Sequence, residues 1–260
     1  MESGHAVTAT APVLSAGVGV KYEGRWAVRM ASFRVSETEL GSTGLGIVTP
    51  RSAAAAAVIS VLSGQVAPGY GYLRVLGYDM NSPAGRAAVS RQCGIASRSW
   101  RPVPGTRIRG LVERAGRRAG QPGADRHLLV AAILDRLGLT PWGDVPFGAA
   151  PEQVARKVRL AVACVHQPRL LLLDGLLDQL PPLERTVLAD VIRDLQRDTA
   201  VIAFGQDPAT LSLICEQVFE LADGVMVGAP MPPHPSPPAL SLQAATSDPG
   251  APARPVSGVR

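Results

Sequence analysis

The chain has 260 residues, a formal net charge of +5 and 46% hydrophobic residues, so it is long enough to bury a sizeable core in one or two domains. No apolar run reaches the roughly 18 residues that a membrane-spanning helix needs, and residues 1–16 lack the basic start of a secretory signal. Cys93, Cys164 and Cys215 match no metal or disulfide spacing, so we expect buried free thiols.

The first hundred residues indicate strands with one helix among them. We expect residues 1–16 to be a loose lead-in without regular structure. The elements expected after it are a strand pair over 18–30 that turns near Glu23 and Gly24, a strand over 31–35, a buried strand over 45–48, a helix over 53–62 and a strand over 72–75.

The composition changes after residue 97, and residues 98–150 are rich in Arg, Gly and Pro. Helical patterns there cover 108–119 and 126–137, which indicates a mostly helical insertion. The expected later elements are helices over 151–165, 183–197 and 208–215, strands over 170–173 and 200–204, and a hairpin of strands 218–221 and 225–227. Residues 229–260 are rich in Pro, Ser and Ala, and we expect this tail to be disordered.

Buried apolar strands that alternate with helices are typical of an α/β fold with a largely parallel sheet. The early strands follow each other closely and favour antiparallel pairing. The sequence therefore predicts one α/β domain with antiparallel strands at its N-terminal side.

The link between the strand over 45–48 and the following helix is the most informative segment. A strand, a tight loop and a helix in this order house the phosphate loop G-x-x-x-x-G-K-[ST], whose glycines, lysine and hydroxyl bind phosphate and magnesium. Here Thr49 and Ala54 occupy the glycine positions, Ala55 the lysine position and Ala56 the hydroxyl position. Ser52, with Ala54, further restricts the backbone curl that phosphate requires. These residues predict no tight ATP binding.

Several scaffold segments, in order and spacing over about residues 17–228, resemble the nucleotide-binding domain of ATP-binding cassette (ABC) transporters. The segments that carry this resemblance are Lys21-Tyr22-Glu23-Gly24, Leu62-Ser63-Gly64, Val75-Leu76-Gly77-Tyr78-Asp79, His166 to Asp174, and Leu221-Ala222-Asp223-Gly224. The resemblance implies a P-loop NTPase-like three-layer α/β core with N-terminal antiparallel strands and an α-helical subdomain inserted at about 98–155. It also implies ATP and magnesium as the ligands of the family.

Each chemical motif placed by this resemblance departs from the family pattern. Asp174 matches the carboxylate that orients magnesium, but it can equally be an inherited strand-end acid. Gly175 stands where the family has its catalytic glutamate, and a glycine cannot act as a general base. The signature loop falls at Pro151 and Glu152, where a carboxylate would repel phosphate although both residues suit a helix start. The aspartate of the inter-subunit loop corresponds to Pro181 and the switch histidine to Gln206.

The same resemblance also assigns Tyr22 and Arg98 to positions with a role in the family. Tyr22 matches the aromatic residue that stacks on adenine, and a half-buried strand tyrosine is the alternative interpretation. Arg98 matches the glutamine that links the nucleotide to the membrane subunit. His166 is too far from the site to replace the switch histidine.

The basic charge is concentrated, since residues 86–126 contain ten arginines against Glu113 and Asp125. This region includes the segment that contacts membrane subunits in the family. We therefore expect a docking face there for a membrane permease subunit or another cassette, formed by Arg98, Arg107, Arg109, Arg117 and Arg118. A merely solvated arginine-rich surface is the alternative.

The sequence favours a degenerate, non-catalytic cassette protein that binds a partner or regulates a transport complex, without a bound cofactor. The first alternative is a working ATP-binding and ATP-hydrolysing subunit of an ABC transporter. The second is a binder of nucleic acid or anionic membrane surfaces through residues 86–126, although no aromatic interleaving supports it and no nucleic acid partner is expected. The expected location is the cytoplasm, or the inner face of the cell membrane as a peripheral protein.

Overall fold

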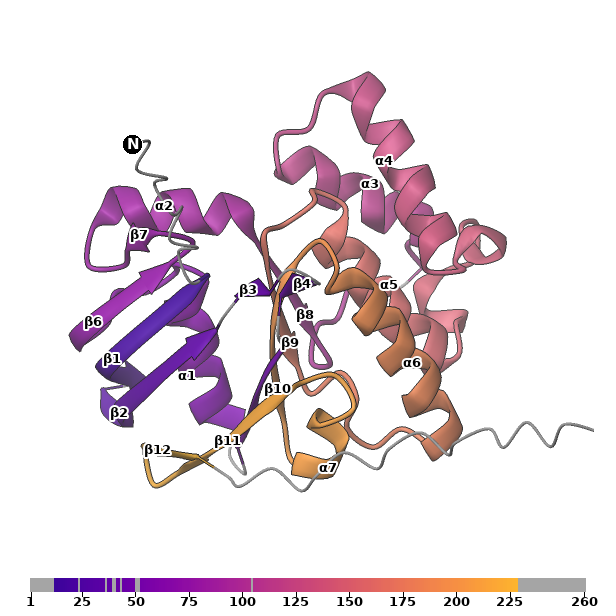
Figure 1. Cartoon of the computed structure of the whole chain (residues 1–260). Helices are drawn as coiled ribbons and strands as arrows, with labels where there is room; N and C mark the ends of the chain where they lie inside the picture. The colour runs from indigo at the N-terminus through magenta and orange to yellow at the C-terminus, as the bar shows by residue number, and fades with distance from the viewer. Residues whose placement is uncertain are drawn as a thin grey trace, which may run out of the picture.

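In the computed structural model, the described residues are 12–22, 24–35, 37–38, 41–42, 44–49, 52–103 and 105–228. They form a mixed α/β fold in which one twisted sheet runs through the molecule and helices pack on both of its sides (Figure 1). The sheet order in this part of the chain is β7-β6-β1-β2-β12-β11-β5-β10-β9-β8. The expectation of a parallel sheet preceded by antiparallel strands is confirmed.

The antiparallel side of the sheet consists of β1 (Val13–Tyr22), β2 (Arg25–Val35), β6 (Tyr70–Val75) and β7 (Tyr78–Asp79). β1 begins at Val13, so residues 13–16 belong to the sheet and the expected lead-in was set four residues too long. β2 also runs unbroken through the two strands expected over residues 25–35. The two-residue strands β3 (Glu37–Thr38) and β4 (Gly41–Ser42) pair with each other outside the main sheet.

The parallel side consists of β5 (Leu45–Val48), β8 (Cys93–Ser97), β9 (Leu170–Asp174), β10 (Ala200–Gly205) and β11 (Gln217–Ala222). β12 (Val225–Gly228) forms a hairpin with β11 and pairs in parallel with β2 through Val225 and Met30. This hairpin therefore joins the two sides into one sheet.

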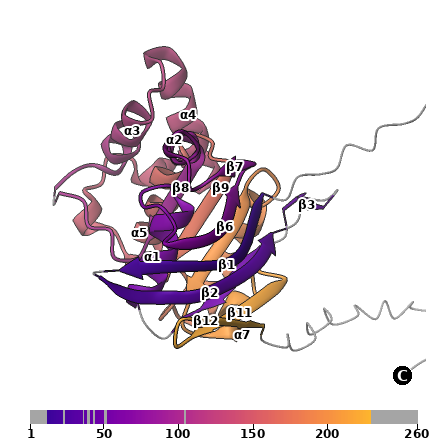
Figure 2. The ribbon, with the colours of Figure 1, turned by 90° about the vertical axis from the view of Figure 1, so that its left-hand side faces the viewer.

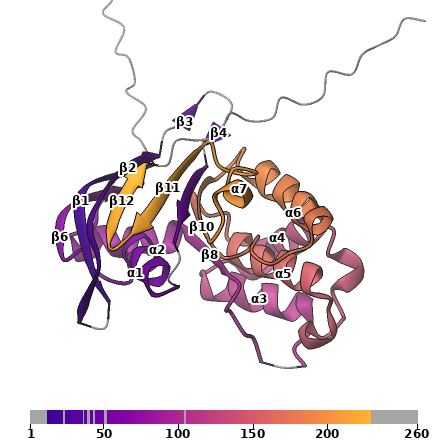
Figure 3. The same ribbon diagram turned by 90° about the horizontal axis from the view of Figure 1, so that it is seen from below.

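Helix α1 (Ser52–Leu62) lies between the two sides of the bent sheet, as the view from below shows (Figure 3). Its buried residues share a core with the inward residues of β1, β2 and β6 and with one face of the parallel strands. The opposite face of the parallel strands is covered by α3 (Ile108–Arg118), α4 (Gly123–Arg136), α5 (Glu152–Cys164), α6 (Pro182–Leu195) and α7 (Pro208–Leu211). Successive residues of a strand point to opposite faces of the sheet, so each buried strand contributes side chains to both hydrophobic cores.

The helical region between β8 and β9 contains α3, α4 and the short 3-10 helices η1 (Thr140–Trp142) and η2 (Phe147–Ala149). The expected helices over 108–119, 126–137 and 151–165 are present, with α4 starting three residues early. The helix α7 is shorter than expected, and residues 212–214 form turns. Helix α2 (Pro83–Gln92) was not predicted, because it buries only Gly85 and Val89 and so has almost no apolar periodicity.

No helix among the described residues combines the length and the apolar character that crossing a membrane requires. All three cysteines are free and buried, as expected. Burial raises the pKa of the Cys93 and Cys164 thiols to about 12, and it also raises the pKa of Cys215. These thiols are therefore protonated packing groups rather than nucleophiles. The tail over 229–260 lies outside the described residues.

Candidate functional site

The candidate site is the edge of the sheet at which the parallel strands β5, β8, β9 and β10 end. In open α/β sheets, ligands bind outside the carboxyl ends of the strands. The structure brings most of the residues singled out in the sequence to this edge. Backbone hydrogen bonds from Thr49 to Gly205 (2.9 Å) and from Gly175 to Phe204 (2.9 Å) hold the strand ends together.

Helix α1 follows β5 after only residues 49–51, of which 50 and 51 lie outside the described part. The positions aligned with the second glycine, the lysine and the hydroxyl of a phosphate loop, Ala54 to Ala56, are helical. Ala55 is 4% exposed and packs with Ala57 in the core beneath the antiparallel strands. A residue at position 55 therefore faces apolar side chains rather than the strand-end edge. The side chain of Ser52 is outside the described residues.

Asp174, the last residue of β9, is half-buried and accepts a hydrogen bond from the Ser97 hydroxyl (2.6 Å). Ser97 is the last residue of the neighbouring strand β8, and it also contacts the Ser99 hydroxyl at 2.8 Å. The Asp174 carbonyl receives the Arg98 amide at 2.9 Å. No group of three or more potential metal-binding side chains occurs in the described part of the chain. Asp174 is thus part of a hydrogen-bonded strand end.

Gly175 has a left-handed conformation (φ 60°), which favours glycine. A Cβ atom at this position would lie 3.3 Å from Oδ2 of Asp178, a tight contact. A glutamate at position 175 would therefore be strained and would bring a second carboxylate beside Asp178. The local backbone therefore favours the glycine that stands where the family has its catalytic glutamate.

Asp178 was not singled out in the sequence, yet it lies at the centre of this edge. Its Oδ1 accepts the backbone N–H of Gln206 at 3.3 Å. Burial raises the pKa of the Asp178 carboxyl, and Asp174 adds to that effect, while Gln206, Arg98 and Arg156 oppose it. Gln206 uses its backbone here, and its side chain is exposed. Gln206 directly follows β10, which ends at Gly205.

Arg156 of α5 fixes the loop that follows β9. It is 3% exposed, and its Nη1 donates to the carbonyls of Leu176 (2.5 Å), Asp178 (2.9 Å) and Gly175 (3.3 Å). Its Nε donates to Glu152 at 2.9 Å. A buried arginine that satisfies three loop carbonyls determines the shape of that loop. An arginine four residues after a helix-initial glutamate is the signal in the sequence that could have identified it.

Glu152 is the first residue of α5 and is paired with two arginines. Its Oε1 accepts from Arg156 and, at 3.4 Å, from Nη1 of Arg159. Burial lowers the pKa of the Arg159 guanidinium, whose Nε is one buried polar atom without a hydrogen-bond partner in the described part. Pro151 and Glu152 start a helix, as the sequence predicts, and the carboxylate of Glu152 is paired with arginines of its own helix. Pro151 precedes it as the N-cap residue.

Pro181 and Arg98, which the resemblance assigns to the inter-subunit loop and to the link with the membrane subunit, make contacts within the fold. Pro181 is the N-cap residue of α6, with an extended backbone that suits a helix start. Arg98 is half-buried and donates from Nη1 to Oε1 of Gln179 at 2.7 Å, so it links the end of β8 to the loop after β9. Arg98 therefore lies at the strand-end edge, apart from the other arginines expected to form one face with it.

The remaining four arginines lie at the two ends of α3. Arg107 precedes the helix and pairs through its backbone with Pro146, and the Arg109 guanidinium lies over Gly143. Arg117 and Arg118 are exposed in the last turn. Eleven residues of helix span about 16 Å, so these side chains form a stripe along the helical region rather than one compact patch.

A groove of about 230 Å³ runs beside α3, lined by Trp100, Arg101, Pro102, Val103, Leu111, Arg114, Ala115, Arg118 and Val162. Trp100 and Phe147 meet edge to face at 5.7 Å behind this groove. The groove combines an aromatic wall with three arginines. It therefore suits an acidic or amphipathic protein segment better than a small apolar molecule.

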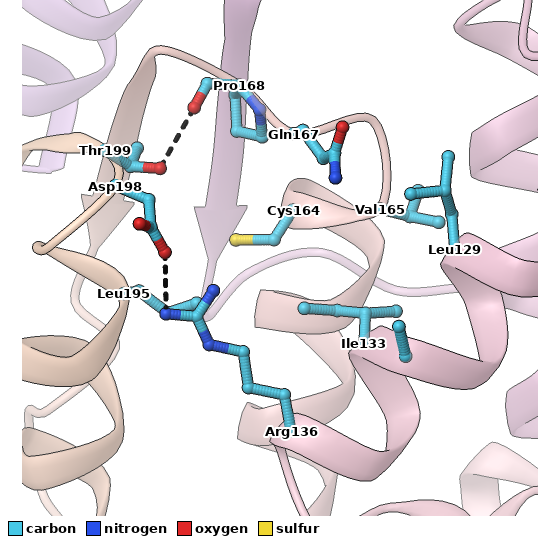
Figure 4. A pocket seen from close by; sticks show the side chains of 11 residues that line it. Leu129, Ile133, Arg136, Cys164, Val165, Gln167, Pro168, Leu195, Asp198 and Thr199 are labelled. Atoms are coloured by element: carbon cyan, nitrogen blue, oxygen red, sulfur yellow. Dashed lines mark hydrogen bonds and ion pairs between the residues drawn. The ribbon is translucent and has the colours of Figure 1, made fainter.

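A larger cavity, of about 420 Å³, lies at the opposite edge of the sheet (Figure 4). Pro168 and Thr199 at its rim precede β9 and β10, so it opens at the amino ends of the strands. Arg136 borders it and pairs with Asp194 (2.8 Å) and Asp198 (3.0 Å). Because its only cation is paired twice, this cavity has no free charge to bind an anion.

His166 and Tyr22 are two further residues that the sequence analysis assessed as possible nucleotide-site residues. His166 contacts the Cys93 carbonyl through Nε2 at 3.3 Å, and burial lowers its pKa, so it is a neutral structural group away from the strand-end edge. Tyr22 is the last residue of β1, but its side chain lies outside the described residues.

No family model matches the chain. Among curated proteins, it is 20% identical over 228 residues to ABC transporter A family member 1 of Dictyostelium discoideum, which covers 85% of this chain and 25% of that protein. It is 24% identical over 186 residues to the methionine import ATP-binding protein MetN 2 of Burkholderia mallei, covering 70% and 47%. The identity to the phosphonates import ATP-binding protein PhnC of Rhizobium meliloti is 24% over 213 residues, covering 77% and 75%. The chain spans less than half the length of the first relatives it matches.

The chain resembles solved structures closely in its fold, although its sequence identity to them is low. The structure of cbiO1 from Clostridium perfringens, described as part of the ABC transporter complex cbiONQ, superposes with a TM-score of 0.72 at 16% identity over 84% of this chain and 87% of that one. A structure described as the ATP-binding subunit of an ABC transporter gives a TM-score of 0.68 at 15% identity, covering 84% and 90%. The fold of this chain is thus similar to that of ABC transporter ATP-binding subunits, and its curated relatives are ABC transporter proteins.

Proposed function

We propose that this chain is a partner-binding cassette subunit of a transport complex that does not hydrolyse ATP. The observation that carries the proposal is that residues 54–57 are helical and that Ala55 and Ala57 are buried in the core, where the family resemblance places a phosphate-binding loop and its lysine. Without that lysine, several kcal/mol of charge-assisted contact to phosphate is missing, by the usual strength of such bonds. Residual affinity from stacking alone would be too weak to matter.

The geometry of the strand ends supports the same proposal. The position of the general base is a left-handed glycine, Gly175, and the loop after it is held by Arg156. Asp174, which would orient magnesium, is bonded to Ser97, and the hydroxyl position of the phosphate loop is Ala56. The residues present therefore do not fit a Mg-ATP group.

The partner in this proposal is a membrane permease subunit or a second cassette, at the cytoplasmic face of the membrane. The groove beside α3 offers an aromatic wall and positive charge from Arg101, Arg114 and Arg118, and Arg107, Arg109 and Arg117 lie along the same helical region outside its lining. The structure described for cbiO1 belongs to a complex that has other subunits, which supports a partner of this kind. We therefore assign the docking role to the α3 groove, and Arg98 to the strand-end edge.

The second candidate function is that of an ATP-binding and ATP-hydrolysing subunit. The names of the relatives favour it, because the methionine and phosphonate import proteins are both called ATP-binding. It requires either an unconventional phosphate contact from residues 49–52 or a phosphate loop supplied by a partner. The two functions are distinguished by nucleotide binding, and not by the fold that they share.

Two experiments test the proposal. Calorimetric titration of the full chain with Mg-ATP should show no binding in the micromolar range; micromolar binding with phosphate release would favour the second function. Charge reversal at Arg107, Arg109, Arg117 and Arg118 should abolish retention of a membrane subunit from detergent extracts of the source cells. Reversal at Arg193, an exposed arginine of α6, is the matched control and should leave retention unchanged. Equal retention by both variants would exclude these four arginines of the α3 region as the docking face.

A further inference from the structure

The outer side of the antiparallel strands carries large exposed side chains that the proposed function does not use. In Figure 2 the strands β6, β1 and β2 face the viewer with α1 behind them. The inward residues of these strands pack on α1, whereas Leu14, Trp26, Tyr70 and Tyr72 on the outer side are 38–44% exposed. Three of these four side chains are aromatic, in a chain with only 4% aromatic residues.

Cross-strand pairing places these residues in rows on one face, because directly paired residues point to the same side of a sheet. Tyr72 pairs with Ala16, and Arg74 pairs with Leu14, which in turn pairs with Arg34 on β2. Tyr70 pairs with Gly19. Lys21 pairs with Trp26 at the far end of the face.

The Tyr70 ring lies across β1 and does not stand away from the sheet. A Cβ atom at Gly19 would collide with the ring, so the missing side chain at that position makes room for it. The Tyr70 hydroxyl donates to the Arg29 carbonyl on β2, one strand further on. The ring is therefore fixed at both ends, and its outer surface is open to a ligand.

Trp26 stands beside this ring and completes an aromatic corner. The two ring centroids are 4.9 Å apart and the rings are inclined by 60°. The Lys21 ammonium lies 4.7 Å from the centroid of the Trp26 ring, so one side of that ring already holds a cation. Tyr72 lies two residues along β6 from Tyr70, about 6.7 Å by the rise of a strand.

Positive charge borders this group of rings at both ends. Lys21 lies at one end and Arg34 and Arg74 at the other, and no ion pair involves them within the described part of the chain. Asp79 of β7, paired with Arg74, is the one acidic residue beside them in the described pairing. We refer to Lys21, Trp26, Arg34, Tyr70, Tyr72 and Arg74 together as the aromatic sheet face.

We propose that the aromatic sheet face binds single-stranded nucleic acid. Exposed aromatic rings on an antiparallel sheet, bordered by Lys and Arg, stack on unpaired bases while the cations meet the phosphates. The spacing of Tyr70 and Tyr72 is about twice the 3.4 Å rise between bases stacked in one strand, so the face fits a strand whose bases are spread apart. A proline-rich peptide could also use the aromatic corner, but it would leave the three cations unmatched. This site is separate from the arginines of α3 and does not depend on the proposed function.

The test uses the full chain and fluorescein-labelled 12-mers of oligo(dT) and oligo(rU), with a duplex of the same length for comparison. Fluorescence anisotropy should show binding of the single strands that weakens as salt is raised, and weaker binding of the duplex. Tyr72→Ala should weaken single-strand binding about tenfold, as expected from one lost stacking contact. Tyr72→Phe keeps the ring and should bind like the unmodified chain. Circular dichroism melting would establish that each variant is folded.

Arg117→Ala with Arg118→Ala on α3 is the matched control for general positive charge and should leave binding unchanged. The proposal is overturned if the single strands do not bind at about 0.1 M salt, or if the α3 variant loses binding while Tyr72→Ala keeps it. It is also overturned if a proline-rich peptide displaces the strand at equal concentration, because the face would then be a peptide site. Equal affinity for anionic lipid vesicles that survives Tyr72→Ala would show that charge alone is responsible.

Discussion

The start of α1 and the loop after β9, the two regions on which the proposed function rests, are stabilised in different ways. At α1, small apolar side chains such as Ala55 and Ala57 pack into the core beneath the antiparallel strands. In the loop after β9, the buried Arg156 donates to three carbonyls and pairs with Glu152. Apolar packing fixes the first region, whereas directed polar contacts fix the second. The comparison indicates that both positions now serve the shape of the fold.

The loop after β9 should be the more sensitive of the two regions. Arg156→Met leaves three loop carbonyls without their donor and removes one of the two arginines paired with Glu152, so we expect a loss of about 3 kcal/mol in the free energy of unfolding. Urea denaturation measures it. Arg193→Met removes an exposed i,i+3 pair with Asp190 and should cost less than about 0.5 kcal/mol. Similar losses for both variants would contradict the role given to Arg156.

The α1 region is probed by returning the lysine that the family motif contains. Ala55→Lys places a long charged side chain in a packed core, so we expect a loss of about 2–3 kcal/mol and no gain of ATP binding. Ala53→Lys, on the exposed side of the same helix, should be nearly neutral. A stable Ala55→Lys variant that binds Mg-ATP would show that the helix start can open into a phosphate loop.

Gly175 tests whether the backbone, rather than the side chain alone, excludes a catalytic base. Gly175→Ala should cost about 1 kcal/mol because an L-residue is strained at φ 60°, and its Cβ would approach Asp178. Gly175→Glu should cost more and should not produce ATP hydrolysis. Thermal melts and a phosphate-release assay measure the two effects. A neutral Gly175→Ala result would remove the backbone argument.

The smallest expected effect concerns pH and Asp178. Burial raises the pKa of this carboxyl in the folded state, so the folded state holds its proton more tightly than the unfolded state does. Its contribution to stability is therefore most favourable below the ordinary aspartate pKa and is lost as pH rises through the raised value. Asp178→Asn should flatten the stability profile over the pH range just above the ordinary aspartate pKa. An unchanged profile would mean that other groups dominate that range.

Much of the fold could be predicted because its strands are short, strongly apolar and separated by recognisable helices, as with Leu170 to Leu173. Asp174, Gly175 and Gln206 were singled out through the family resemblance, and the structure places them at one edge because parallel strands end together. The contacts of Arg156, Asp178 and Ser97 could not be predicted, because they join residues about 20 to 80 positions apart through side-chain directions that periodicity does not encode. The aromatic sheet face was missed for the same reason, since Tyr70 and Trp26 meet only across Gly19.

The arginine stripe shows a further limit of sequence reasoning. Ten arginines between residues 86 and 126 suggest one basic surface, but the fold assigns them to separate places. Arg98 holds Gln179 at the strand ends, and Arg126 bonds to the Gln121 carbonyl beside α3. A count of charges along the sequence therefore overestimates the size of a basic docking face when the fold places those side chains against different neighbours.

The proposed function requires that the strand-end edge keep the shape of a cassette without a nucleotide site. Isothermal titration of the folded full chain with Mg-ATP, up to about 1 mM nucleotide, tests it most directly. The proposed function predicts no binding heat that fits a micromolar dissociation constant, and no phosphate release. Micromolar binding accompanied by phosphate release that Asp174→Asn abolishes would contradict it.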